Sequence, residues 1–347
     1  MAFDDSQSKL PLLPTLPLET GRRRVLQAGL AGLASLGTPG LLRAAEPVKE
    51  LRLDYAYYSP TSLVLRRFGW LEEALRPEGI SVKWVFSAGS NRALEYLNGN
   101  AIDIGSSAGL AAVLAKANGN PIRTPYIFSR PEWTALLVRK DSPIQSVADL
   151  KGKKVAATKG TDPYLFLLRA LQVAKLQRSD IEHVALQHAD GRAALEQGRV
   201  DAWAGLDPLM AASELDAGSR ILYRNVAFNT YGFLNVRQDF IVQQPQITRQ
   251  VIAAYERARL WTIGHISEAA RIVSEEAKVS LQVALLQLKL RTDLSQPQPG
   301  AEHVKALQAA APLLLQEQLV RPGTDVNRVV TELIDTQFAR SLTHGQG

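Results

Sequence analysis

Four short polar segments of this sequence have the residue types needed to bind a small anion. They are Ser59–Ser62, Ser87–Asn91, Ser106–Ser107 and Lys159–Asp162, which are rich in hydroxyl groups and glycine. Each follows an expected strand and opens an expected helix, where unpaired N–H groups and the positive end of the helix dipole attract negative charge. Ser, Thr and Asp are also ordinary helix caps. Because ligands of open α/β sheets lie beyond the carboxyl ends of the strands, the four loops together predict an anion site.

Two arginines and two tryptophans are further candidates. A guanidinium gives an anionic headgroup two parallel donors, which makes Arg92 and Arg130 candidate anchors. The alternatives are a solvated helix face for Arg92 and a loop cation for Arg130. Trp133 and Trp203 could pack against an alkyl tail, although the strand position of Trp203 favours a place in the core.

Few patterns of an enzyme active site occur in the sequence. One string, Gly105–Gly109, matches the Gly-x-Ser-x-Gly pattern of a nucleophile elbow, and there is no phosphate-binding P-loop. Cysteine is absent, so there are no disulfides, thiol nucleophiles or cysteine-ligated metals. His183 and His188 form the only close histidine pair, at a spacing that matches no metal site, and are interpreted as ordinary histidines. We therefore expect no catalytic residue, no metal and no cofactor.

The candidate loops are positioned by alternating strands and helices. Strands are expected at residues 51–57, 82–86, 102–105, 136–139, 154–157, 184–187, 202–205 and 231–236. Helices are expected at 63–75, 92–97, 106–117, 164–174 and 191–197, followed by a largely helical tail from 245 to 341 with breaks at 296–300 and 322–323. This alternation predicts an α/β protein with mostly parallel sheets covered by helices.

The pattern indicates two lobes, because about 300 residues are too many for one compact core. The first lobe is expected to comprise residues 46–139 and 232–347, and the second residues 140–231. Two chain crossings between lobes describe a hinged architecture that closes around a ligand.

The first 45 residues are predicted to be an export signal. Arg22-Arg23-Arg24 precedes a weakly apolar run that ends near Leu42, which is typical of a signal for the twin-arginine route. The run is shorter than the roughly 20 apolar residues of a membrane span and contains glycines and Pro39. Cleavage is expected near Ala44 or Ala45.

Charge argues against a nucleic-acid partner. The formal net charge is +6, of which the leader carries +2, and no dense Lys/Arg run follows residue 45. The modest positive excess that remains suits a protein that meets small anions.

Several stretches of the sequence resemble the sulfonate-, taurine- and nitrate-binding proteins of ABC importers, and aliphatic sulfonate binders most of all. The resemblance runs clearly from Leu51 to Leu222. The stretches that carry it are 88–98, 100–105, 137–144, 147–156, 159–160 with 167–171, and 200–203 with 207–208. It implies a type II periplasmic-binding-protein clamshell and a monomeric periplasmic receptor. Such a receptor would deliver a sulfonate to ABC permease subunits in the inner membrane. Nitrate, taurine and other small anions are alternative ligands.

The resemblance also implies where the ligand lies. Together with the loop chemistry, it predicts these ligand contacts: Tyr58, Ser59, Thr61, Ser62, Gly89, Ser90, Asn91, Ser106, Ser107, Arg130, Gly160, Thr161, Asp162, Trp203 and Asp207. Thiamine-pyrimidine synthases share this type of fold, but they bear cysteine and are intracellular, which disfavours that alternative.

Asp162 departs from the family pattern, in which serines usually follow the Lys-Gly pair. An ionised carboxylate near a sulfonate would repel it, unless Asp162 faces away as a helix cap.

Overall fold

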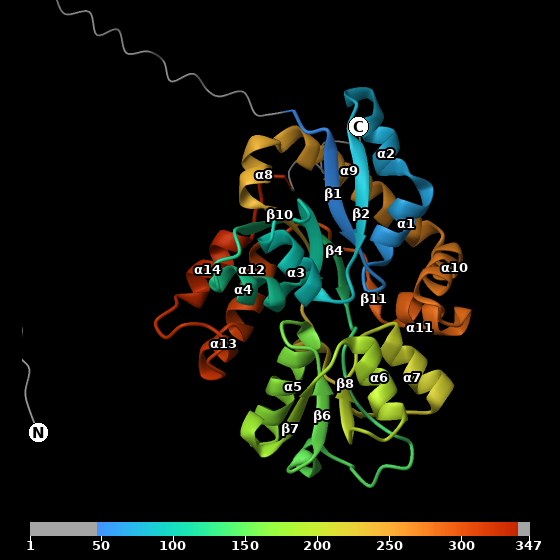
Figure 1. Cartoon of the computed structure of the whole chain (residues 1–347), viewed down its shortest axis with the longest axis vertical. Coiled ribbons are helices and arrows are strands. Elements are labelled where there is room, and N and C mark those ends of the chain that lie inside the picture. Colours follow the sequence, from blue (N-terminus) through green and yellow to red (C-terminus); the bar gives the residue numbers. More distant parts are fainter. Residues whose placement is uncertain (1–46, 339–347) are drawn as a thin grey trace, which may run out of the picture. The chain divides into compact units, whose positions relative to one another are not determined.

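The computed structural model describes residues 47–338 and contains two sheets flanked by helices (Figure 1). The expected export signal lies outside the described residues. In the first sheet the strand order is β11-β4-β10-β3-β1-β2, and in the second it is β7-β6-β8-β5-β9. The predicted α/β class is confirmed. Parallel pairing is confined to β2-β1-β3 and β7-β6-β8, and the remaining neighbours are antiparallel.

The strands of the first sheet are β1 (Glu50–Tyr55), β2 (Ser81–Phe86), β3 (Ile104–Ala108), β4 (Ile122–Pro131), β10 (Gly232–Arg237) and β11 (Thr292–Asp293). Those of the second are β5 (Leu136–Val138), β6 (Lys154–Ala157), β7 (Glu182–Ala185), β8 (Ala202–Ala204) and β9 (Arg220–Tyr223). Strands β3 and β8 are buried along their whole length, as expected for strands covered on both faces, although β3 carries Ser106 and Ser107 beside its apolar residues.

Helices follow most of the parallel strands. They are α1 (Pro60–Phe68), α2 (Trp70–Leu75), α3 (Ser90–Asn98), α4 (Gly109–Ala117), α5 (Asp162–Val173), α6 (His188–Glu196) and α7 (Leu209–Ala217). The tail adds α8 (Gln238–Gln243), α9 (Pro245–Gly264), α10 (Ile266–Ala277), α11 (Leu281–Leu290), α12 (Ala301–Ala310), α13 (Pro312–Gln316) and α14 (Val326–Leu333). Four single 3-10 turns complete the set: Arg76–Glu78, Val147–Leu150, Arg178–Asp180 and Val226–Phe228.

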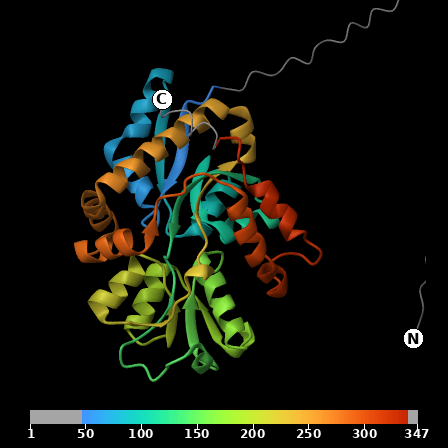
Figure 2. The same cartoon turned by 180° about the vertical axis from the view of Figure 1, so that it is seen from behind.

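The long helix α9 covers the first sheet, as the view from behind shows (Figure 2). Tyr255 of α9 is fully buried and lies 6.1 Å, centroid to centroid, from the ring of Tyr126 on β4. Burial of such aromatic pairs contributes strongly to a core. Within residues 47–338, no helix combines the length and the apolar character needed to cross a bilayer.

Two predicted boundaries are wrong, the first for a local reason and the second because of long-range strand pairing. The single helix expected at 63–75 is split at Gly69, whose φ of 64° ends α1 in a left-handed cap. The strand expected to close the first lobe, β5, pairs instead with β8 and β9 of the second sheet. Sequence alternation shows that a strand exists but does not show which sheet it joins.

The return of the chain near residue 231 is confirmed. Strand β10 inserts between β3 and β4 and is antiparallel to both. The chain therefore passes between the two sheets after β4 and again before β10, through Glu132–Ala135 and Arg224–Tyr231.

Candidate ligand-binding site

Asp162 connects the start of α5 to both crossing segments. Its Oδ2 accepts hydrogen bonds from Trp133 Nε1 at 3.0 Å and from the Thr230 backbone N–H at 2.9 Å. Its Oδ1 accepts a third, from Thr230 Oγ1, at 2.8 Å. Burial raises the pKa of this carboxyl, and the three donors act in the opposite direction. Both oxygens are thus occupied by the crossings, and the charge faces neither a cap position nor an open cleft.

The start of α1 presents hydroxyl groups that have no partner. Ser59 and Thr61 are fully buried, and neither Ser59 Oγ nor Thr61 Oγ1 has a hydrogen-bond partner. Ser62 Oγ differs, because it donates to the Ser59 carbonyl at 2.7 Å and so closes the first turn. Tyr58 donates its hydroxyl to the Ser106 carbonyl at 3.2 Å. Since buried polar groups in native proteins nearly always find partners, the two free hydroxyls are what a ligand site predicts.

Ser106 and Ser107 do not open a helix, contrary to the sequence prediction. Both lie within β3, where Ser106 Oγ donates to Asp54 Oδ2 at 2.7 Å and Ser107 Oγ accepts from Asn235 Nδ2 at 2.8 Å. The partners come from β1 and β10, the two neighbouring strands. Burial raises the pKa of Asp54 to about 7, against the lowering effect of the bonds from Ser106.

The start of α3 approaches the start of α6 on the second sheet. A Cβ atom placed on Gly89 would lie 2.9 Å from Asn91 Oδ1 and 2.9 Å from His188 Nε2. Both of those atoms are buried without a hydrogen-bond partner. Ser90 Oγ is already engaged, because it accepts from the Ala108 backbone N–H at 2.9 Å. The structure thus brings two unsatisfied polar atoms from different sheets to the same point.

A cavity of about 580 Å³ lies beside this contact and is walled by elements of both sheets. Helices α3 and α4 form one wall, in which Leu94, Ala111, Leu114 and Ala115 lie beside polar side chains of α3, and the loops after β6 and β7 form the other wall. It is lined by Asn91, Leu94, Glu95, Asn98, Ala111, Leu114, Ala115, Asn118, Asn120, Thr158, Lys159, Gly160, Ala185, Leu186 and Gln187. Apolar walls with a few convergent polar groups are typical of a site for a small organic ligand.

The loop after β6 reaches this cavity through Gly160. Its φ of 75° is a left-handed conformation that favours glycine, and a Cβ here would meet Asn91 Cβ at 3.4 Å. Thr161 is buried and donates to the Thr158 carbonyl at 2.6 Å. Of the predicted contacts, Asn91 and Gly160 therefore line the cavity directly.

The candidate arginines lie at the surface. Arg92 is exposed and pairs with Glu95 at 2.7 Å, one turn along α3. Arg130, at the end of β4, is also exposed, and its guanidinium carbon lies 5.8 Å from the ring centroid of Tyr231. Neither arginine is a buried anchor within this structure.

Trp203 is a core residue of the second sheet. It is almost completely buried, and a Cβ on Gly191 of α6 would lie 2.7 Å from its Nε1. This position agrees with the prediction that Trp203 packs in the core. Trp133 lies in the first crossing, with its ring 5.8 Å from that of Tyr58 in an edge-to-face arrangement.

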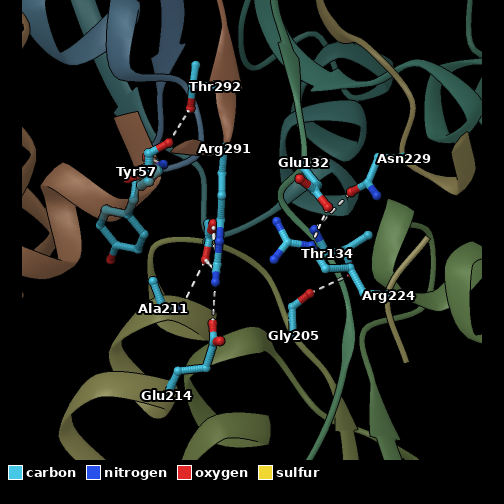
Figure 3. A network of polar contacts seen from close by, with 12 residues as sticks. Tyr57, Glu132, Thr134, Gly205, Ala211, Glu214, Arg224, Asn229, Arg291 and Thr292 are labelled. Carbon is cyan, nitrogen blue, oxygen red and sulfur yellow. Dashed lines mark hydrogen bonds and ion pairs between the residues drawn. The ribbon is translucent and has the colours of Figure 1, made fainter. Parts of the chain in front are cut away.

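Asp207 belongs to an ion network rather than to an open site, and Figure 3 shows the other two members of that network, Arg291 and Glu214. Arg291 Nη1 lies 3.1 Å from Asp207 Oδ1, and Arg291 Nη2 lies 2.6 Å from Glu214 Oε2. The side chains of Arg291 and Asp207 are 4% and 0% exposed. Burial raises the pKa of Asp207 to about 6, although Arg291 acts to lower it. This network attaches the segment after α11 to α7 of the second sheet.

The sequence analysis missed His188. A signal for it was present, because His188 follows a strand of the second sheet and is the first residue of α6, the same kind of junction as the chosen loops. The sequence analysis tested His188 and His183 only as a metal-binding pair and did not consider the place of His188 at the start of a helix. No cluster of three His, Asp or Glu side chains able to hold a metal ion occurs among the described residues.

A family model described as "NMT1/THI5 like" matches residues 69–269. That range includes the second sheet and most of the first.

The relatives are similar along nearly their whole length. A protein of Escherichia coli (strain K12), named as an aliphatic sulfonates-binding protein, is 31% identical over 308 residues, which are 88% of this chain and 96% of the relative. A Bacillus subtilis (strain 168) protein of the same name is 28% identical over 309 residues, covering 88% and 93%. The solved alkanesulfonate-binding protein SsuA of Xanthomonas axonopodis pv. citri, bound to MOPS, has a TM-score of 0.75 and 26% identity, covering 83% of this chain and 98% of its own.

Proposed function

The chain belongs to the NMT1/THI5-like family and has the two-lobed type II periplasmic-binding fold of its sulfonate-binding relatives, and from this premise we propose that it is the solute-binding component of an ABC importer. Its ligand is an organosulfonate held between the two sheets. One observation carries the proposal: buried polar side-chain atoms without a partner lie at the starts of α1, α3 and α6, and those of α3 and α6 meet at Gly89.

The chemistry of this region suits a sulfonate. Helix starts supply backbone N–H donors, and Ser59 and Thr61 supply hydroxyls that are free to donate. The apolar wall formed by Leu94, Ala111 and Leu114 suits an organic tail. We place the headgroup against the α1 and α3 starts and the tail in the cavity of about 580 Å³.

Export and delivery are part of the proposal. The arginine-rich leader, residues 1–45, directs the protein to the periplasm by the twin-arginine route and is removed there. The mature protein acts as a monomer and passes its ligand to the ABC permease subunits of the inner membrane. The lobes are the two sheets with their helices, with hinges at Glu132–Ala135 and Arg224–Tyr231.

A binding role is favoured over an enzymatic one. The chain has no cysteine, and the two relatives at 31% and 28% identity are named for binding. Ligand recognition by hydroxyls and amides also requires no proton transfer or nucleophile.

A thermal-shift panel on the protein from residue 46 onward tests the proposal. The panel contains alkanesulfonates of graded length, taurine, MOPS, nitrate, sulfate and a phosphonate. A ligand at 100 times its dissociation constant adds about 2.7 kcal/mol to the free energy of unfolding, which moves the midpoint by several degrees. A rise restricted to sulfonates supports the proposal, and a rise with nitrate alone, or with nothing, contradicts it.

A further inference from the structure

His188 has a buried ring nitrogen with no partner, at the point where the two sheets meet. The residue is 2% exposed, and its Nε2 forms no hydrogen bond. Gly89 of the first sheet approaches it so closely that a Cβ on Gly89 would lie 2.9 Å from Nε2. An unsatisfied buried polar atom destabilises the folded state, so its presence in a native protein needs a reason.

The neighbours of His188 determine which nitrogen carries the proton. Thr158 Oγ1 donates its single proton to the Leu186 carbonyl at 2.7 Å. The same oxygen lies 3.2 Å from His188 Nδ1 and must therefore accept a hydrogen bond from Nδ1–H. In the neutral ring, Nε2 is then left with a lone pair and no proton. The atom that faces Gly89 is an acceptor.

The ring stays neutral at physiological pH. Complete burial lowers the pKa of His188 to about 3. Its place as first residue of α6 disfavours a cation further, because the positive end of the helix dipole lies there. The charged side chains that line the adjacent cavity are Lys159, from the loop after β6, and Glu95, from α3, and neither forms a hydrogen bond with the ring.

A second acceptor lies at the same place. Asn91 Oδ1 is buried without a partner and is also 2.9 Å from the Cβ position of Gly89. A simple alkanesulfonate brings only acceptor oxygens and methylene groups, so it would leave both atoms unsatisfied. An ammonium group has three donors and satisfies both, and a hydroxyl has one donor.

Resting on the proposed function, we propose that His188 Nε2 accepts a hydrogen bond from the ligand, which makes the substrate class the sulfonates that carry an amino or hydroxyl group on their tail. Asn91 shares this role, and Gly89 allows the approach because it has no side chain. Such a site binds an isosteric ligand without a donor weakly, because its two acceptors lose their contact with water and gain no hydrogen bond in exchange.

Three ligands with the same number of heavy atoms test the inference: 2-aminoethanesulfonate, 2-hydroxyethanesulfonate and propanesulfonate. Calorimetric titration of the protein from residue 46 onward should give affinities in that order, with the amino ligand at least tenfold tighter than propanesulfonate. In His188→Phe the advantage of the two polar ligands should shrink to within about threefold, because the acceptor is gone. In His188→Gln, which keeps an acceptor, part of the affinity advantage over propanesulfonate should be restored.

His265→Gln is the matched control, because this exposed histidine lies on the first-sheet side at the end of α9. It should bind all three ligands as the parent does. If His188→Phe does not fold, the ranking in the parent and in His188→Gln still decides the matter. Equal affinity for the three sulfonates, or proton uptake on binding propanesulfonate in buffers of different ionisation enthalpy, overturns this inference alone. Failure of all three to bind overturns the proposed function as well.

Discussion

Trp133 Nε1 lies 3.0 Å from Asp162 Oδ2, and through this bond the first crossing segment is fixed to the first turn of α5. Thr230 of the second crossing donates to the same carboxylate twice, at 2.9 and 2.8 Å. One buried side chain from the second sheet thus connects both chain segments that pass between the sheets. Hinge residues are those that change backbone angles when lobes close. This carboxylate is therefore bonded to the two segments whose backbone angles would change on closure.

Replacing Asp162 should weaken the protein more than replacing an ordinary buried polar residue. Asp162→Ala leaves Trp133 Nε1 and the Thr230 N–H buried without an acceptor, and we expect a loss of about 3 kcal/mol or more in the free energy of unfolding. Asp162→Asn keeps one acceptor oxygen and should lose less. Urea denaturation monitored by tryptophan fluorescence gives both values. Equal losses in the two variants would contradict the role of the carboxylate as a shared acceptor.

The buried ion pair between Arg291 and Asp207 should be sensitive to truncation. Arg291→Met leaves Asp207 unpaired and 0% exposed, and we expect a loss of about 3–5 kcal/mol at pH 8. Loss of the arginine also raises the pKa of Asp207 further above its present value of about 6. The carboxyl is then protonated at pH 5, so most of the lost stability should be regained there.

The control for this pair is Arg328→Met, which removes an exposed partner of Glu332 on α14. Its unfolding midpoint should change little at either pH. If the two arginine variants behaved alike, the Arg291 network would not stabilise the junction between α11 and α7.

Asp54 should impose a pH dependence on stability. Burial holds its pKa at about 7 in the folded chain, above the ordinary value of 3.8, so the folded state binds the extra proton between these limits. The stability due to this proton is complete below about pH 4 and is lost as the pH rises through about 7. The loss is at most about 4 kcal/mol. Urea denaturation from pH 4 to pH 8 should show this decline in the parent and a flatter profile in Asp54→Asn. Parallel profiles would exclude the titration of Asp54 as the cause.

The contact between Gly89 and His188 should limit how closely the two sheets approach. Gly89 has a φ of 174°, an extended conformation open to any residue, so Gly89→Ala introduces a contact rather than backbone strain. The new methyl would meet His188 Nε2, and we expect sulfonate affinity to fall at least tenfold. Gly264→Ala is the matched control, because a Cβ there meets nothing within 4 Å. Unchanged affinity in Gly89→Ala would show that the ligand does not use this closed contact.

The leader should be required for export. Replacing Arg22 and Arg23 by lysine is expected to hold the precursor in the cytoplasm, since the twin-arginine route reads the paired guanidinium groups. Immunoblots of periplasmic and cytoplasmic fractions measure this. N-terminal sequencing of the exported protein should begin near Ala45, and a periplasmic product that retains Met1 would refute the signal.

The sequence predicted the alternation of elements well because short-range patterns determine it. The loop at Lys159–Asp162 and the return near Tyr231 were found from turn residues and strand patterns alone. The role of Ser106 was not found, because its partner Asp54 lies 52 residues away on another strand. A hydroxyl in a polar pair of residues looks the same in sequence whether it caps a helix or bonds across a sheet.

Long-range partners also explain the other differences. Asp162 was recognised as a carboxylate out of place, but its donors lie in two distant crossing segments. His188 was interpreted as an ordinary histidine because its spacing from His183 matches no metal site, and only its approach to Gly89 reveals an atom without a partner. Each of these properties depends on how two segments meet, which local patterns do not contain.

The position of β10 has a consequence for how the chain is assembled during synthesis. The second sheet is encoded by one unbroken stretch, from Leu136 to Tyr223, whereas the first needs a central strand that begins only at Gly232. A growing chain that has emerged as far as Tyr223 therefore holds every strand of the second sheet, while β3 and β4 of the first still lack the strand that joins them. Domains usually fold in the order in which they are made. Here the first sheet, whose strand β1 is synthesised earliest, is the one that can be completed only after the second sheet.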